Sequence, residues 1–241
     1  MATVPVFLIF AVAAFAQSVT GFGFALVAVP LLGSVIDPKA AVVTVGLVSL
    51  FLTTGTAMAD HRHVRWTVAL AFSGTALLGM PLGLLVLSEV SASTLTALIA
   101  VVVTGCAAIV WRGWQLEPTP LRVGAVGVLS GLLLTATGTY GPPLATAVRA
   151  FALEPRAFRA TLAAVFTFSG ALGVAGFFWS GEATRSTWQL CLVGGFASAI
   201  GGWTGSQVLS SLNGAHFRKI VLGALLLSAA VALARAVTTL L

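Results

Sequence analysis

The sequence predicts a polytopic α-helical membrane protein, and three observations lead to this fold class. Charged residues make up 7% of the 241-residue chain, whereas a soluble globular protein has about 25%. Hydrophobic residues make up 59%, and the mean hydropathy is +1.07. The few charges separate apolar runs, most of them near the ~20 residues with which a helix crosses a bilayer: 1–36, 40–59, 66–88, 90–111, 123–148, 160–181, 186–217 and 220–234.

The two halves of the chain align with each other. At a shift of 117 residues, Thr20-Gly21 meets Thr137-Gly138, and Asp37-Pro38-Lys39-Ala40 meets Glu154-Pro155-Arg156-Ala157. At a shift of 122 residues, the pair Gly79 and Gly83 meets Gly201 and Gly205. We therefore expect two homologous repeats, 1–117 and 118–241, as in many secondary transporters. Glycines four residues apart are typical of close helix packing, and we expect that role for both pairs.

Each repeat opens with a segment that is too long for one crossing and is interrupted by glycines. The first segment, 3–36, would be about 51 Å long as one helix, and it is broken at 17–23. The second segment, 121–153, is broken at 135–143. Two short helices joined by such a break indicate a re-entrant hairpin. Non-helical backbone at membrane depth is tolerated only inside protein or along a cavity.

Three full crossings follow each hairpin in this interpretation. The expected spans are 38–59, 66–88 and 92–111 in the first repeat, then 157–179, 187–209 and 216–238 in the second. With this topology nine basic residues share one side, namely Arg62, Arg65, Arg112, Arg122, Arg149, Arg156, Arg159, Arg218 and Lys219. The other side keeps three, Lys39, Arg185 and Arg235. The positive-inside rule then predicts inverted repeats with both termini outside.

The two hairpin tips are the expected substrate site. Each second helix starts at its break, so its free N–H groups and positive dipole end would face a pocket near the membrane midplane. Glycines allow close approach of a ligand to the backbone, and the neighbouring hydroxyl and amide groups add donors. The candidate residues are Gln17, Ser18, Thr20, Gly21, Phe22, Gly23, Thr137, Gly138, Thr139, Tyr140, Gly141 and Pro142. The alternative is that these small residues only permit tight helix packing.

Arg149 follows the second tip and has two interpretations. It either reaches the inner surface as a snorkelling side chain or gathers anions at a cytoplasmic mouth.

Every carboxylate lies in or beside a loop, which argues against a proton relay inside the bilayer. The two cysteines, Cys106 and Cys191, are far apart and show no metal-ligand spacing. We expect no catalytic residues, no metal and no cofactor, so the chain is not expected to be an enzyme.

The basic residues stand singly in short loops, so the formal charge of +6 does not indicate a nucleic-acid partner. The expected partners are a small anion and the lipid bilayer. The oligomeric state stays open, with a homodimer among the alternatives.

Two motifs resemble the TauE/SafE family of sulfite-exporter-like membrane proteins. They are Ala16-Gln17-Ser18-Val19-Thr20-Gly21-Phe22-Gly23-Phe24, followed by Pro30, and Gly138-Thr139-Tyr140-Gly141-Pro142-Pro143-Leu144. The resemblance covers essentially the whole chain. It implies a transporter of sulfite, of organosulfonates such as sulfoacetate, or of other small anions, most simply an exporter, in a bacterial cytoplasmic (inner) membrane. An importer of sulfur oxyanions or thiosulfate, a permease for another metabolite and a non-transporting scaffold are the alternatives. The anion, the direction of transport and any coupling ion stay open.

Overall fold

The computed structural model describes residues 3–113 and 117–209 and a few positions between 223 and 237. Every regular element in this part of the chain is a helix, as the composition predicts. The helices are α1 Thr3–Thr20, α2 Phe24–Gly33, α3 Pro38–Ala59, the short 3-10 helix η1 His61–His63, α4 Trp66–Glu89, α5 Ala92–Arg112, α6 Pro120–Thr137, α7 Gly141–Arg149, α8 Pro155–Trp179 and α9 Arg185–Leu209. The expected span 216–238 lies outside the described residues apart from single positions.

Five of the described helices are long and apolar enough to cross a membrane, namely α3, α4, α5, α6 and α8. The helices of the first hairpin are shorter and also apolar. Large apolar side chains such as Leu78, Leu82 and Leu192 are exposed on the outside of the bundle, as expected for a surface that faces lipid. The chain is a multi-pass helical membrane protein.

The acidic-Pro-basic-Ala tetrads mark the starts of α3 and α8. Asp37 caps α3, since its carboxylate accepts hydrogen bonds from the N–H groups of Lys39 (2.9 Å) and Ala40 (3.1 Å). Glu154 is the residue before α8, and proline occupies the first helical position in both cases. A negative charge stabilises the positive N-terminal end of a helix. Proline is well tolerated at the first helical position, because an N–H there would have no partner within the helix. The tetrad is therefore a repeated helix start.

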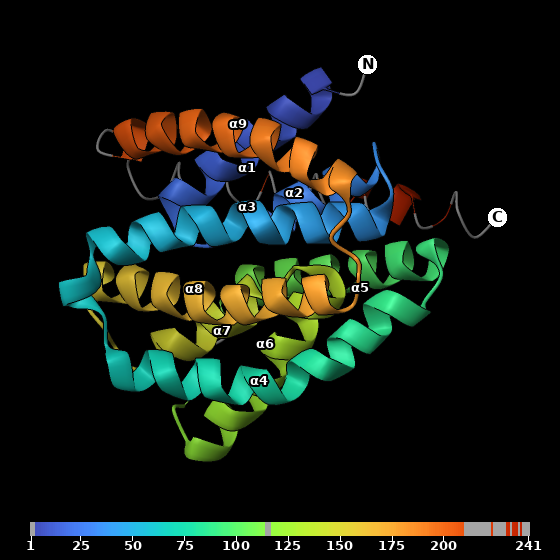
Figure 1. Ribbon diagram of the computed structural model, residues 1–241. Helices are drawn as coiled ribbons and strands as arrows, with labels where there is room; N and C mark the ends of the chain where they lie inside the picture. The colour runs from blue at the N-terminus through green and yellow to red at the C-terminus, as the bar shows by residue number, and fades with distance from the viewer. Residues whose placement is uncertain are drawn as a thin grey trace.

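Helices α3 and α8 form the centre of the bundle (Figure 1). Helices α1 and α9 pack together on one side of this central pair, at the top of the figure, and α4 and α6 pack together on the other side. The short helices α2 and α7 lie next to the central pair, α2 against α3 and α7 against α8. This arrangement encloses both interrupted segments in protein.

The predicted glycine packing faces let neighbouring helices approach to backbone contact. A Cβ on Gly79 would overlap the carbonyl oxygen of Val128 in α6, and a Cβ on Gly201 would overlap that of Ala11 in α1. Likewise, Gly83 faces the Thr135 hydroxyl and Gly205 faces the Ser18 hydroxyl. The contacts of α4 with α6 therefore match those of α9 with α1. The contacting residues of α1 and α6 are related by the shift of 117 residues, and the glycines of α4 and α9 by the shift of 122.

Polar contacts define the two ends of the bundle. At one end, called here the Lys39 end, the Lys39 ammonium donates to the carbonyl of Ser88, 2.7 Å away. At the other, the Asp60 end, Asp60 pairs with Arg156 (2.7 Å), and the N–H of Arg65 donates to the Thr161 hydroxyl (3.0 Å). Helix α3 runs from the Lys39 end to the Asp60 end, and α4 and α8 run back.

The two hairpins enter from opposite ends of the bundle. Helix α1 runs parallel to α9, starts at the Lys39 end, and α2 returns to that end (Figure 1). Helix α6 runs parallel to α4, starts at the Asp60 end, and α7 returns there. The assignment of these ends to the membrane faces, and the division into repeats 1–117 and 118–241, stay predictions.

We expect Gly79→Ala to lower the melting temperature of the purified protein sharply. The added methyl would overlap the backbone of Val128 and push α4 away from α6, and such overpacking costs about 1–3 kcal/mol or more. Gly74→Ala is the matched control, because the same helix leaves open space around Gly74. Alanine there should leave stability unchanged or raise it, by up to about 1 kcal/mol. Equal melting temperatures for the two variants would contradict the close α4–α6 packing.

Candidate functional site

Glycines in the left-handed conformation form the break in each hairpin. The backbone φ is +79° at Gly21, +107° at Gly23 and +69° at Gly138. The breaks are shorter than the sequence predicts, because α1 continues to Thr20 and α6 to Thr137 before the chain turns. A single glycine with positive φ is enough to stop a helix, so the preceding hydroxyl residues remain in the last helical turn.

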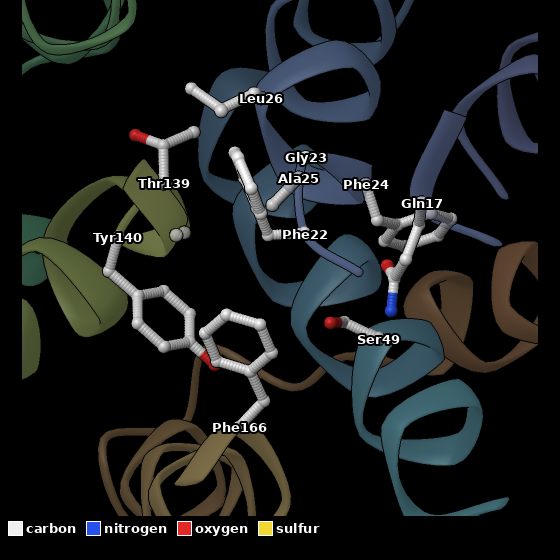
Figure 2. Close-up of a pocket in the computed structure, with 12 residues that line it drawn as sticks. Gln17, Phe22, Gly23, Phe24, Ala25, Leu26, Ser49, Thr139, Tyr140 and Phe166 are labelled. Atoms are coloured by element: carbon white, nitrogen blue, oxygen red, sulfur yellow. The ribbon is translucent and has the colours of Figure 1, made fainter. Parts of the chain in front are cut away.

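The two tips lie against each other in the middle of the bundle. A Cβ built on Gly141 would lie 3.5 Å from the Cβ of Phe22 and 3.8 Å from the backbone nitrogen of Gly23. A cavity of about 300 Å³ lies between the tips, α3 and α8, and we call it the tip cavity (Figure 2). Its lining consists of Gln17, Phe22, Gly23, Phe24, Ala25, Leu26, Ser49, Gly138, Thr139, Tyr140, Gly141 and Phe166.

Backbone donors enter this cavity unequally from the two tips. Helix α2 begins after Gly23, which has no side chain to cap it, and Phe24, Ala25 and Leu26 all line the cavity. The first N–H groups of a helix have no partner within it and carry its positive dipole end. Helix α7 starts with Gly141 followed by two prolines, and proline has no N–H to offer. The α2 tip is therefore the stronger anion-facing end.

Three polar side chains of the tip cavity have no hydrogen-bond partner among the described residues. They are the carboxamide of Gln17, the hydroxyl of Ser49 and the hydroxyl of Tyr140. Figure 2 shows the Gln17 amide and the Ser49 hydroxyl on the same side of the cavity, with Tyr140 on the opposite side. All three can donate to an oxyanion. Ser49 is a residue that the sequence analysis missed.

Other predicted donors are already used inside the protein. The Ser18 hydroxyl donates to the carbonyl of Phe15 (2.8 Å), and the Thr137 hydroxyl lies 3.0 Å from the carbonyl of Leu133. The hydroxyls of Thr137 and Thr139 also share a hydrogen bond of 2.8 Å. These groups hold the tips in shape. Of the predicted residues, Ser18, Gly21, Thr137 and Pro142 do not line the tip cavity, and the side chain of Thr20 lies outside the described residues.

Aromatic rings narrow the tip cavity. Tyr140 packs edge-on against Phe166, with ring centroids 5.1 Å apart and an angle of 84° between the planes. Only about 20 Å³ of the cavity is wide enough for the centre of a water molecule, which is room for one or two waters. An ion with several oxygens needs the tips or these rings to move apart.

A second, apolar cavity of about 310 Å³ continues from the tip cavity toward the Lys39 end. The two cavities share Ala25, Ser49, Gly138, Tyr140 and Phe166. The remaining lining is Val45, Gly46, Leu50, Leu134, Gly170, Val174 and Phe177. It therefore carries no charged side chain, and the rings of Tyr140 and Phe166 stand where the cavities meet.

Charged and metal-binding groups are absent from the tip cavity. Within the described residues no group of three or more His, Cys, Asp or Glu side chains could hold a metal ion. Arg149 is exposed at the end of α7, where its guanidinium lies 5.8 Å from the centre of the Phe158 ring. It lines neither cavity, so its role as a cytoplasmic mouth stays a prediction.

The family model described as sulfite exporter TauE/SafE matches residues 6–232 of the chain. No curated protein and no solved structure matches this chain.

We expect Gly138→Ala to destabilise the protein and Gly141→Ala to leave its melting temperature nearly unchanged. Alanine at Gly138 would hold a left-handed φ of +69°, and its Cβ would press to 3.2 Å from a Val29 methyl. A left-handed conformation costs a non-glycine residue roughly 1–2 kcal/mol. At Gly141 the added methyl meets only ordinary contacts of 3.5 Å or more. A lower melting temperature for Gly141→Ala than for Gly138→Ala would contradict this description of the tips.

Proposed function

The chain belongs to the sulfite exporter TauE/SafE family, a family of membrane transporters, and from this membership we propose that it exports sulfite or a small organosulfonate such as sulfoacetate. In this proposal the anion binds in the tip cavity, near the middle of the bilayer. The uncapped start of α2 supplies backbone donors, and Gln17, Ser49 and Tyr140 supply side-chain donors.

The observation that carries the proposal is the set of donors without partners at the tip cavity. A polar group inside a protein without a partner is unfavourable. Here the buried Tyr140 and the half-buried Gln17 and Ser49 surround one space between two hairpins. Each of them can donate a hydrogen bond, whereas a carboxylate would repel an anion, and none lines the cavity. The positive dipole end of α2 adds to this preference. A small oxyanion is the ligand class that these groups suit.

Export agrees with the energetics of a bacterial inner membrane. A cell interior that is electrically negative favours the exit of an anion by ~2.3 kcal/mol per charge per 100 mV. Outward transport of an oxyanion then needs no coupling ion unless its concentration outside is high. The proposal therefore includes no cofactor and no catalytic step.

The proposed architecture consists of two inverted repeats, 1–117 and 118–241. The Asp60 end, with its excess of arginines, faces the cytoplasm, and the Lys39 end and both termini face outward. The opposite entry of the two hairpins and the matching glycine contacts support this arrangement. Repeats of this kind allow alternating access by rocking of one half against the other around a fixed site.

We expect sulfite and sulfoacetate to raise the melting temperature of the purified protein. A ligand at about 100 times its Kd stabilises the folded state by about 2.7 kcal/mol. Tyr140→Phe removes one donor and keeps the ring, so it should weaken binding about tenfold to a hundredfold. Thermal-shift titration with sulfite, thiosulfate, sulfoacetate, taurine and simple carboxylates measures this, and flux into or out of proteoliposomes gives the direction of transport.

Ser130→Ala is the matched control for the binding measurement. The Ser130 hydroxyl is buried without a partner, as a cavity hydroxyl is, but it does not line the tip cavity. Its removal should leave every anion response unchanged. A protein that responds to none of the anions, or a Tyr140→Phe variant that binds as tightly as the parent protein, would refute the proposed site.

A reporter that is active only outside the cytoplasm should be active when fused after Leu241. The same reporter inserted at η1, at the Asp60 end, should be inactive, because nine basic residues are expected on that side. Activity at η1 and none after Leu241 would contradict the proposed orientation. Activity at both positions would contradict a single topology with opposite ends.

A further inference from the structure

A third cavity, of about 320 Å³, lies on the Asp60 side of the first hairpin tip. It is lined by Gln17, Ser18, Gly21, Thr53, Thr56, Arg159 and Ala163. About 40 Å³ of it is wide enough for the centre of a water molecule, against about 20 Å³ in the tip cavity. We call it the Arg159 cavity, because among the cavities described it has the one charged lining residue.

The guanidinium of Arg159 is partly buried and has no counterion among the described residues. One of its N–H groups donates to the carbonyl of Ser18, 2.8 Å away. A guanidinium has five N–H donors, so four remain without a protein partner in the described part of the chain. Arg156, one turn earlier in α8, instead pairs with Asp60 at 2.7 Å. The two arginines at this end of α8 therefore differ, because Arg156 has a carboxylate partner and Arg159 has none among the described residues.

Arg159 caps the end of α1 with one of its N–H donors, but this role does not account for the polar cavity beside it. The Ser18 carbonyl belongs to the negative end of α1, where a cation is favourable. A cap of this kind needs a single hydrogen bond, and it does not need a polar space beside it. A partly buried cation is stabilised further by an anion within reach, and the fork of a guanidinium matches two oxygens of an oxyanion.

Two helix faces connect the Arg159 cavity to the tip cavity. Ser49, Thr53 and Thr56 are spaced i, i+4 and i+7 along α3, so they share one face. Ser49 lines the tip cavity, and the two threonines line the Arg159 cavity. The facing side of α8 has the same spacing, with Arg159 and Ala163 followed by Phe166 at the tip cavity.

The side chain of Gln17 lies where the two cavities meet, because it lines both. Its carboxamide has no hydrogen-bond partner among the described residues. A small anion that leaves Arg159 would therefore meet this donor next, before it reaches the Ser49 and Tyr140 hydroxyls.

We propose that the Arg159 cavity is a second anion-binding site, which takes a small oxyanion from the arginine-rich end and passes it by Gln17 to the tip cavity. This inference rests on the proposed transport function. It assigns Arg159 the role of a substrate-binding residue at the entrance, and it makes the rate at low substrate concentration depend on that side chain.

The test compares initial rates of sulfite efflux from proteoliposomes for the parent protein, Arg159→Gln, Arg159→Lys and Arg156→Gln. Loss of hydrogen bonds to a charged ligand should raise the KM of Arg159→Gln about tenfold to a hundredfold, with a smaller change in maximal rate. Arg159→Lys keeps the charge without the fork, so its KM should lie in between. Arg156→Gln removes a charge from the same helix and should keep the KM of the parent protein.

A second variant keeps Arg159 and its bond to α1. Thr56 is exposed on α3, so Thr56→Leu should fold normally while its side chain fills the cavity, and KM should rise severalfold. This variant decides the question if Arg159→Gln does not fold. An unchanged KM in Thr56→Leu, or in a folded Arg159→Gln, overturns the second site. A parent protein that transports no anion refutes the proposed function itself, which is a separate outcome.

Discussion

Inside a bilayer every backbone N–H and C=O needs a partner, and this constraint organises the protein. Two glycine breaks leave backbone groups unpaired where lipid could not accept them. The chain encloses both breaks between the central helices α3 and α8 and the outer pairs α1–α9 and α4–α6. Glycines at the outer interfaces let the helices approach to backbone contact, so the enclosure is tight. The cavities follow from it, because polar groups that lipid excludes can be placed only there.

The two tips have related sequences and different chemistry. The first presents N–H groups at the start of α2, whereas two prolines remove such donors from the start of α7. The second tip contributes Tyr140 instead, whose ring contacts Phe166 and whose hydroxyl has no described partner. In the proposed mechanism, one tip supplies most of the fixed positive field. The other supplies a side chain that must move before an anion can pass.

The cavities lie in a row along α3 and α8, and their character changes along it. The Arg159 cavity near the Asp60 end is polar and contains a cation, the tip cavity holds neutral donors, and the cavity toward the Lys39 end is largely apolar. An anion that follows this row would be bound most strongly at its entrance and more weakly beyond it. Transport needs binding that is weak enough for release, and a row of decreasing polarity fits export from the Asp60 end.

The sequence by itself determined the helical membrane class, the positions of the two breaks and the family. Charge-free runs, glycine-containing breaks and repeated acidic-Pro-basic-Ala tetrads are local features, so they can be identified along the chain. The sequence analysis expected N–H donors at both tips, and it missed that Pro142 and Pro143 remove them from the start of α7. Only the tertiary structure decided which polar groups are free. Ser18, Thr137 and Thr139 are bonded within the protein, whereas Ser49 and Arg159, which sequence analysis left out of the site, line the cavities. The bonds of Ser18, Thr137 and Thr139 stay within their own helix or turn. The cavities differ, because side chains from several helices line them and packing alone decides which helices meet.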